Sequence, residues 1–333
     1  MNVVLLVLSF AIILAGALLF TNAVEWLGHR LKLGEGAVGS LLAAVGTAMP
    51  ETLIAIVALI GAKEGADQVA IGAIVGAPFL LATLAMGLVG LFAYLYRERR
   101  ETGLHLDAHG PTLERDLLFF LLFFAVSLAL AWGAPDALRI PIGIAVILAY
   151  PVYIRRTLLG GGEVQDHGTL DPLIFERREE HRMNPSLLFC VVQLLVGLGA
   201  MVGGAHLFVE ELLHIAESLG VEAVVLALIL APLATELPEK VNSFFWVREN
   251  KDSLALGNIT GAMVFQSTIP VGIGLIFTDW ALSLNASISV VLGLIGGFLA
   301  YEMLHRRDRF SLAAVLTWFV LYTSYIAIVA VSA

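Results

Sequence analysis

The chain has 333 residues, of which 59% are hydrophobic and 14% are charged, and its mean hydropathy is +0.90. These values exclude a soluble globular domain, because such a domain would have to bury nearly every helix on all sides. The formal charge of −9 comes without a long basic block, so we expect no nucleic-acid partner. The single cysteine, Cys190, excludes a disulfide framework and a thiolate metal site.

Apolar runs of the length that a transmembrane helix needs, about 20 residues, occur in both halves of the chain. In the first half, the predicted helices cover residues 2–22, 36–60, 68–96, 115–134 and 138–158. In the second half, they cover residues 185–209, 221–246, 253–277, 281–303 and 310–331. The first run lacks a positive n-region and a clear cleavage site, which indicates a retained helix and not a signal peptide. The pattern predicts an all-α integral membrane protein with ten transmembrane helices.

The Lys and Arg residues lie almost entirely on one side of this ten-helix arrangement. The opposite side receives only Lys63 and Arg139, and Lys240 falls inside a predicted helix. By the positive-inside rule, the polar linker between the halves is cytoplasmic and both termini face outward, in a multi-pass protein of the cell membrane. The predicted domains are a five-helix repeat, this linker and a second five-helix repeat, at residues 1–158, 159–184 and 185–333.

One short sequence occurs twice, once in each half. Residues 46–51 read Gly-Thr-Ala-Met-Pro-Glu, and residues 234–239 read Ala-Thr-Glu-Leu-Pro-Glu. A second pair of matching segments follows at residues 72–76 and 257–261, with glycine at both ends of each. Because each half contains five predicted helices, the two halves enter the membrane in opposite senses, as in the inverted repeats of transporters.

Each copy of the first motif places a carboxylate directly after a proline inside a predicted membrane helix. A charge at that depth costs about 3 kcal/mol or more. Pro50 and Pro238 also leave the carbonyl four residues earlier without its helical donor. Calcium takes about six to eight oxygen ligands, from carboxylates and carbonyls. Glu51 and Glu239, together with those carbonyls, therefore predict a cation site near the middle of the membrane.

These segments resemble the two alpha repeats of the calcium/cation antiporter superfamily, and most closely its sodium/calcium exchanger branch. The repeats of that family read roughly G-T-S-x-P-E on one helix and G-N-x-x-G-S-N on the next. The resemblance implies alternating access, with Ca²⁺ moved in one direction against Na⁺ or H⁺ in the other. It implies a transporter and not an enzyme, with no cofactor besides the transported ions. It also implies that Ca²⁺ is bound by Thr47, Glu51, Thr235 and Glu239.

The chain departs from the family pattern at several positions. Ala48, Ala77 and Ala262 replace serines. Because a desolvated sodium ion needs such oxygens, we expect at least one family sodium site to be missing or altered. Glu236 stands at the serine position of the second motif, and Lys240 follows it at i+4. The two side chains can form a structural ion pair. Alternatively, Glu236 carries an exchanged proton, or the Lys240 ammonium replaces a bound cation.

Two further sets of residues are candidates for ion binding. Asn258 and Gln266 lie on the eighth predicted helix, where their side chains either donate oxygens to the site or form interhelical hydrogen bonds. His206, Glu210 and His214 are spaced at i, i+4 and i+8, which places them on one stripe of the sixth helix. This stripe is either an entry site for a divalent metal or the solvated end of a helix.

Other functions could use the same carboxylates. A cation channel, or a carrier for Mg²⁺, Mn²⁺ or a monovalent ion, is one alternative, although channels usually build rings of identical groups around an oligomer axis. An intramembrane metalloprotease is disfavoured because the chain contains no H-E-x-x-H motif. We expect the second, third, seventh and eighth helices to line the site and the first and sixth to move. The oligomeric state stays open.

Overall fold

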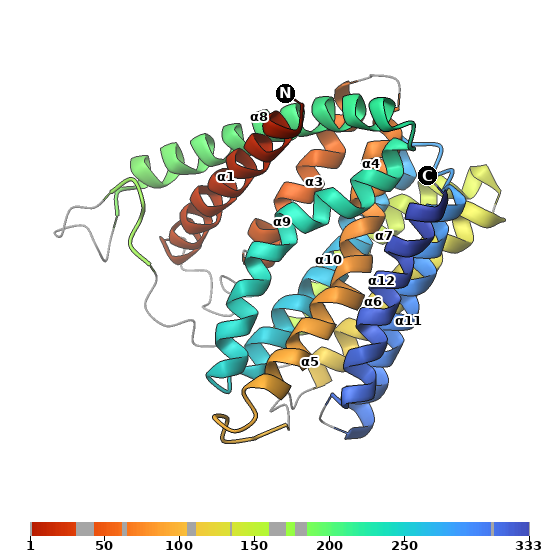
Figure 1. Cartoon of the computed structure of the whole chain (residues 1–333). Coiled ribbons are helices and arrows are strands. Elements are labelled where there is room, and N and C mark those ends of the chain that lie inside the picture. Colours follow the sequence, from red (N-terminus) through yellow and green to blue (C-terminus); the bar gives the residue numbers. More distant parts are fainter. Residues whose placement is uncertain are drawn as a thin grey trace.

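The computed structural model describes residues 2–30, 43–61, 65–104, 111–133, 135–159, 171–176, 185–307 and 310–332. Over these residues every regular element is helical and none is a strand (Figure 1). The α-helices of the first half are α1 (Asn2–Arg30), α3 (Ala43–Gly61), α4 (Ala66–Leu80), α5 (Met86–Leu95), α6 (Pro111–Trp132) and α7 (Arg139–Leu159). Those of the second half are α8 (Leu187–Leu219), α9 (Ala223–Arg248), α10 (Asp252–Phe277), α11 (Leu284–Arg307) and α12 (Leu312–Ser332). The predicted all-α class is confirmed for the described residues.

By length and composition, 8 helical segments in the described part of the chain could cross a membrane. Two shorter apolar segments, Ala48–Gly61 of α3 and Ala223–Leu233 of α9, belong to the helices that carry the duplicated motif. The first contains Glu51, and the second ends just before Thr235 and Glu236. The prediction of a multi-pass membrane protein is therefore confirmed. The count of ten spans and the inverted repeats stay predictions.

The span that runs from Ala66 to Leu95 is the most deeply buried in the bundle. Within it, Pro78 interrupts the hydrogen-bond ladder, and the helix then widens into the π-helical turn η2 (Leu81–Ala85). The carbonyl oxygen of Ala82 in this turn lies so close to Gly296 of α11 that a Cβ there would overlap it. Helix α4 is thus central, in contact with α3, α9, α10 and α11.

Two glycines of α4 allow α9 to approach closely. A Cβ on Gly72 would lie 2.7 Å from the Cβ of Ala227, and a Cβ on Gly76 would lie 2.9 Å from the Cα of Leu228. Small residues at such spacing permit backbone-to-backbone packing of membrane helices. Gly261, which matches Gly76 in the second copy of the motif, has no heavy atom of the described chain within 4 Å of an added Cβ. The close approach of α4 to α9 is therefore built on the first copy of this motif.

Helices α1 and α8 pack against each other at one edge of the bundle (Figure 1). A Cβ on Gly16 would lie 2.8 Å from the carbonyl oxygen of Gly197, and a Cβ on Gly197 would lie 2.8 Å from the carbonyl oxygen of Gly16. Because neither glycine can take a side chain without moving the other helix, the first and sixth predicted spans form one closely packed pair.

The described part of the linker, residues 171–176, is attached to this helix pair. The indole N–H of Trp26 on α1 donates to the carbonyl of Asp171 at 2.9 Å. The backbone N–H of Phe175 donates to the side-chain oxygen of Gln193 on α8, also at 2.9 Å. The linker segment therefore follows α1 and α8 and not the central helices.

Candidate ion-binding site

The duplicated motif places buried carboxylates on two different helices. Glu51 of α3 is 2% exposed, and Glu236 of α9 is 1% exposed. Helices α3 and α9 contact each other, and both contact α4 and α10. These are the four helices predicted to line the site. A carboxylate buried this deeply in a membrane protein requires a proton, a cation or hydrogen-bond donors.

Gln266 of α10 contacts the acid of α9 directly. Its Nε2 donates a hydrogen bond to Oε1 of Glu236 at 3.2 Å, and both side chains are buried. Among the described residues, the Oε1 of Gln266 accepts no hydrogen bond. The main-chain carbonyl of Gln266 also lacks its usual helical donor, because the residue four positions later is Pro270. Gln266 therefore holds its side-chain oxygen close to the carboxylate of Glu236, and its main-chain carbonyl is a second neutral oxygen on the same residue.

The threonines near the motif are hydrogen-bonded to their own helices. Thr235 donates its hydroxyl to the carbonyl of Ala231 at 2.9 Å. Thr52, which follows Glu51, donates its hydroxyl to the carbonyl of Ala48 at 2.9 Å. These bonds use the hydroxyl protons and leave the hydroxyl oxygens as acceptors. Thr52 is as buried as the motif residues, but it lies outside the duplicated motif and the sequence alone does not point to it.

Three of the predicted site residues have side chains outside the described part of the structure. Thr47 lies in α3, and Glu239 and Lys240 lie in α9, where only the helical backbone is described. The pairing of Glu51 with Glu239, and of Glu236 with Lys240, therefore stays a prediction.

Asn258 lies at a different level of α10 from Gln266. At about 1.5 Å per residue, the two are separated by about 12 Å along the helix axis. Asn258 is half-buried, whereas Gln266 is fully buried. The structure thus brings Gln266, but not Asn258, to the carboxylate of Glu236.

The stripe of His206, Glu210 and His214 lies on α8 as its spacing predicts. Both histidines are exposed, and Glu210 is half-buried. Within the described ranges, no group of three or more His, Cys, Asp or Glu side chains is placed to hold a metal ion. The choice between a solvated helix end and a metal entry site therefore stays a prediction.

The sequence profile of one protein family covers nearly the whole chain. The family described as sodium/calcium exchanger protein matches residues 1–159 and 189–331. The chain belongs to this family. The predicted resemblance is thereby confirmed. The prediction that the chain is a membrane protein of ion transport is confirmed as well.

Other members and solved structures agree with this family membership. The membrane protein MJ0091 of Methanocaldococcus jannaschii is 24% identical over 281 residues, which are 82% of this chain and 83% of that protein. The sodium/calcium exchanger MaX1 of Methanosarcina acetivorans is 24% identical over 298 residues, 83% of each chain. The crystal structure of the H⁺/Ca²⁺ exchanger CAX has a TM-score of 0.73 at 20% identity, covering 98% of this chain and 81% of that one. The sodium-calcium exchanger NCX_Mj has a TM-score of 0.60 at 21% identity, covering 98% and 97%.

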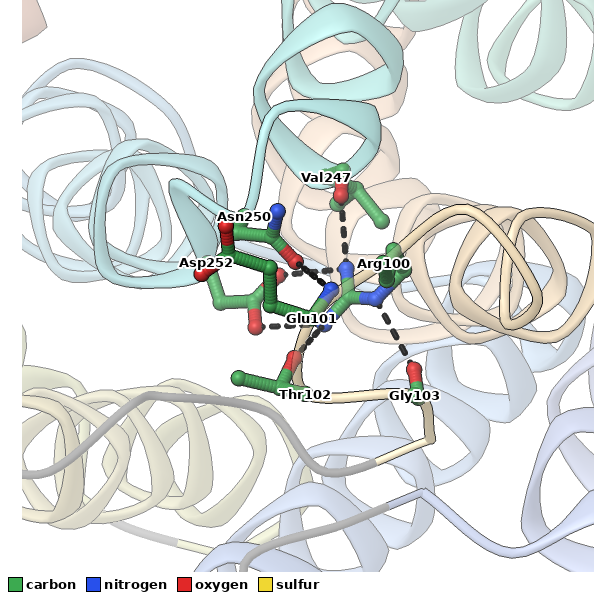
Figure 2. A network of polar contacts seen from close by, with 7 residues as sticks. All are labelled: Arg100, Glu101, Thr102, Gly103, Val247, Asn250 and Asp252. Atoms are coloured by element: carbon green, nitrogen blue, oxygen red, sulfur yellow. Dashed lines mark hydrogen bonds and ion pairs between the residues drawn. The ribbon is translucent and has the colours of Figure 1, made fainter.

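In this member of the exchanger family, a buried ion pair fixes the start of α10 (Figure 2). Arg100, in the segment after α5, donates to both carboxylate oxygens of Asp252 at 2.6 and 2.7 Å. The remaining guanidinium protons go to the carbonyls of Val247 and Gly103 and to the hydroxyl of Thr102. All five donors of the arginine are therefore used. In the sequence, Arg100 belongs to a basic run that indicates only a cytoplasmic loop.

Proposed function

We propose that the chain is a secondary-active antiporter that exchanges Ca²⁺, or a related divalent cation, for Na⁺ or H⁺ by alternating access. The observation that carries the proposal is the buried contact between Glu236 of α9 and Gln266 of α10, in a helix cluster that also contains the buried Glu51. Carboxylates and neutral oxygens are the ligands that Ca²⁺ prefers. Two negative charges balance one divalent cation in a site of low dielectric constant. The transported ions are the only ligands that this function requires.

The names of the relatives support this function. MaX1 is a sodium/calcium exchanger, CAX is an H⁺/Ca²⁺ exchanger, and the NCX_Mj crystals were soaked with Na⁺ and Sr²⁺. Calcium exchange is common to these proteins, whereas the counter-ion differs. Family membership therefore leaves both Na⁺ and H⁺ as counter-ions, and the choice between them depends on the residues of this chain.

The residues of the site favour H⁺ as the counter-ion. Glu236 adds a carboxylate where the family motif has serine, and it lies against Gln266. When carboxylates lie close together, their negative charges repel each other, and this repulsion favours the binding of a proton by one of them. Ala48, Ala77 and Ala262 at the same time remove hydroxyl oxygens that a sodium ion would need.

We further propose ten spans arranged as two inverted repeats, with α3 and α9 as the two spans beyond the eight. Gly257 follows Gly72 by the same number of residues as Asn250 follows Gly65. Gly65 and Asn250 both have a positive φ, +78° and +60°. Both precede the motif helices α4 and α10. Recurrence of the same backbone conformation at matching positions supports a repeat.

The proposed topology has both termini outside and residues 159–184 in the cytoplasm. The N- and C-terminal ends lie at the same end of the bundle in Figure 1, as an even number of spans requires. The Lys and Arg distribution sets the direction of insertion. The repeats are residues 1–158 and 185–333.

The test is counter-transport by the purified full-length chain in liposomes. Uptake of radioactive Ca²⁺ is measured against an outward Na⁺ gradient and, separately, against a pH gradient. Glu51→Gln and Glu239→Gln each remove one charge of the proposed pair, so each should lower exchange by about a hundredfold or more. Glu249→Gln, at an exposed position of the α9–α10 junction, is the control and should keep wild-type activity.

Two results would contradict the antiporter. Full activity of either glutamine variant would remove the paired glutamates from the mechanism. Ca²⁺ flux that follows its own gradient and needs no counter-ion would favour a channel.

A further inference from the structure

A polar cluster lies between α6, α7 and α10, apart from the contact of Glu236 with Gln266. Asp116 of α6 is 2% exposed. Its Oδ1 accepts a hydrogen bond from the hydroxyl of Tyr153 on α7 at 2.9 Å, and its Oδ2 accepts one from the hydroxyl of Thr260 on α10 at 3.0 Å. Each carboxylate oxygen therefore has one neutral donor, and the two donors come from different helices.

The cationic side chains near this carboxyl make their hydrogen bonds to other groups. Arg115, the preceding residue, donates through Nη2 to the hydroxyl of Thr157 at 3.0 Å. On the side of α11, the Nδ1 of His305 lies 3.1 Å from a carboxylate oxygen of Glu114. Among the described residues, no Lys, Arg or His forms an ion pair with Asp116. The carboxylate is thus hydrogen-bonded by hydroxyl groups, whereas the guanidinium of Arg115 acts on it at longer range, from 5.9 Å above the centre of the Tyr153 ring.

Aromatic rings surround the cluster on α7 and α10. Tyr153 is packed edge-on against Phe119, with ring centroids 5.4 Å apart, and stacks on Tyr150 at 6.0 Å. Phe265 of α10 packs against Tyr150 at 5.3 Å. Among the residues that the structure describes, α7 contributes neutral phenols to this cluster and α10 contributes the hydroxyl of Thr260. Such apolar surroundings make an ionised carboxylate costly and a neutral acid cheap.

The number of oxygens in the cluster suits a proton better than a metal cation. A dehydrated sodium or calcium ion needs several oxygen ligands, about six to eight for calcium. Here one carboxylate and two hydroxyls are present, and both hydroxyl protons point at the carboxylate. A proton needs only one acceptor oxygen.

We propose that Asp116, with Tyr153 and Thr260, forms a proton-binding site that links proton uptake to the attachment of α10. In the ionised state, both carboxylate oxygens accept hydrogen bonds and tie α10 to α6 and α7. In the protonated state, one oxygen carries hydrogen, so that it becomes a donor and a poorer acceptor. The attachment of α10 through Thr260 then weakens.

This site deepens the proposed exchange function and rests on it, because α10 also carries Gln266. At about 1.5 Å per residue, Thr260 and Gln266 are about 9 Å apart along the helix. A change in how α10 is held against α6 and α7 therefore reaches the contact between Gln266 and Glu236. The proton of Asp116 would act on Ca²⁺ exchange without entering the Ca²⁺ site itself.

The experiment compares Asp116→Asn with wild type and with Glu114→Gln, in which a more exposed carboxyl of the same helix turn is neutralised. The rate of Ca²⁺ exchange is measured over a range of pH in liposomes. Infrared difference spectra of the same samples at high and low pH detect the C=O band of a buried carboxylic acid. We expect Asp116→Asn to lose this band and the pH-dependent part of the exchange rate, and Glu114→Gln to keep both.

A second variant covers the case in which Asp116→Asn does not fold. Tyr153→Phe keeps the ring packing and removes one hydrogen bond to the ionised carboxylate. Without this bond the ionised carboxylate is less stable, so the carboxyl keeps its proton to a higher pH. The midpoint of the pH profile should therefore move upward by about one pH unit. An unchanged midpoint would overturn the proposal.

The proton site and the exchange function can fail separately. If Asp116→Asn keeps both the infrared band and the wild-type pH profile, Asp116 only holds three helices together and the proton site is wrong. If the wild-type chain moves no Ca²⁺ under any gradient, the exchange function is wrong. The infrared spectra then still decide whether Asp116 binds a proton, because the band of the wild type is either lost or kept in Asp116→Asn.

Discussion

At the scale of single residues, a neutral amide is the group that connects two helices of the candidate site. Gln266 donates to Glu236, while its own Oε1 and its main-chain carbonyl are left for another partner. The freed carbonyl is a consequence of Pro270, which has no N–H to donate. Proline and a polar side chain thus occur close together in the sequence of α10, as they do in the duplicated motif.

Gln266→Leu tests this residue. The variant removes one neutral ligand and the hydrogen bond to Glu236, so we expect Ca²⁺ to bind about tenfold more weakly. The dependence of exchange rate on Ca²⁺ concentration provides the measurement. Ser267→Ala is the matched control, because within the described structure the hydroxyl of Ser267 donates to the carbonyl of Val264 in its own helix. Equal Ca²⁺ affinities for Gln266→Leu and wild type would exclude Gln266 from the site.

Arg100 illustrates a residue whose role is stability. Its guanidinium and the carboxylate of Asp252 are both fully buried, and every donor is used. Arg100→Ala leaves an uncompensated buried charge, so we expect a loss of about 3–5 kcal/mol in the free energy of unfolding. Thermal unfolding in detergent measures this. Lys251→Ala, which breaks the exposed pair with Glu249, should change stability little.

Replacement of both partners separates charge from packing. In Arg100→Met combined with Asp252→Leu, no buried charge is left unpaired, so the double variant should unfold at a higher temperature than Arg100→Ala. If the double variant were the less stable of the two, the unpaired carboxylate of Asp252 would not be the cause of the loss in Arg100→Ala.

At the scale of the elements, the first glycine motif forms a packing surface between two helices. Gly72 and Gly76 of α4 lie against the backbone of α9. One glycine pair therefore works as a packing surface between helices. Helix α10 is attached to its neighbours by side chains as well, such as Thr260 and Gln266.

Two helical glycines give a pair of variants with opposite expectations. In Gly76→Ala the new methyl group would meet the backbone of Leu228, which cannot move aside, so stability should fall by about 1–3 kcal/mol. In Gly199→Ala, at an exposed position of α8, the methyl group meets no described atom, and alanine favours the helix by about 1 kcal/mol. Thermal unfolding in detergent compares the two. Equal losses in both variants would show that the close α4–α9 contact does not determine the difference.

The pair formed by α1 and α8 is the element best suited to move as a unit. Its two helices are in close backbone contact at Gly16 and Gly197. The linker segment 171–176 is hydrogen-bonded to both of them and adds to their connection. Such a pair can change its position without losing its internal contacts, as the prediction of a moving first and sixth span requires.

At the scale of the whole molecule, the positions of the helices follow closely from hydropathy. The predicted run 253–277 agrees with α10 at Asp252–Phe277, and 138–158 agrees with α7 at Arg139–Leu159. The ends of α8 differ: an apolar run of 185–209 was expected, and the helix continues to Leu219. The extension carries polar residues and was therefore left out of the apolar run. Hydropathy identifies the part of a helix that suits the membrane, and not the residue at which the helix ends.

The sequence by itself determined the membrane class, the helices, the duplicated proline–glutamate motif and the family. These follow from local patterns, namely apolar length, residue spacing and repetition. Only the tertiary structure decided which faces meet: Gln266 with Glu236, Thr260 with Asp116, and Arg100 with Asp252. These partners lie 30, 144 and 152 residues apart in the chain. Periodicity within one helix carries no information about the rotation and depth of its neighbour, so these contacts depend on how the helices pack.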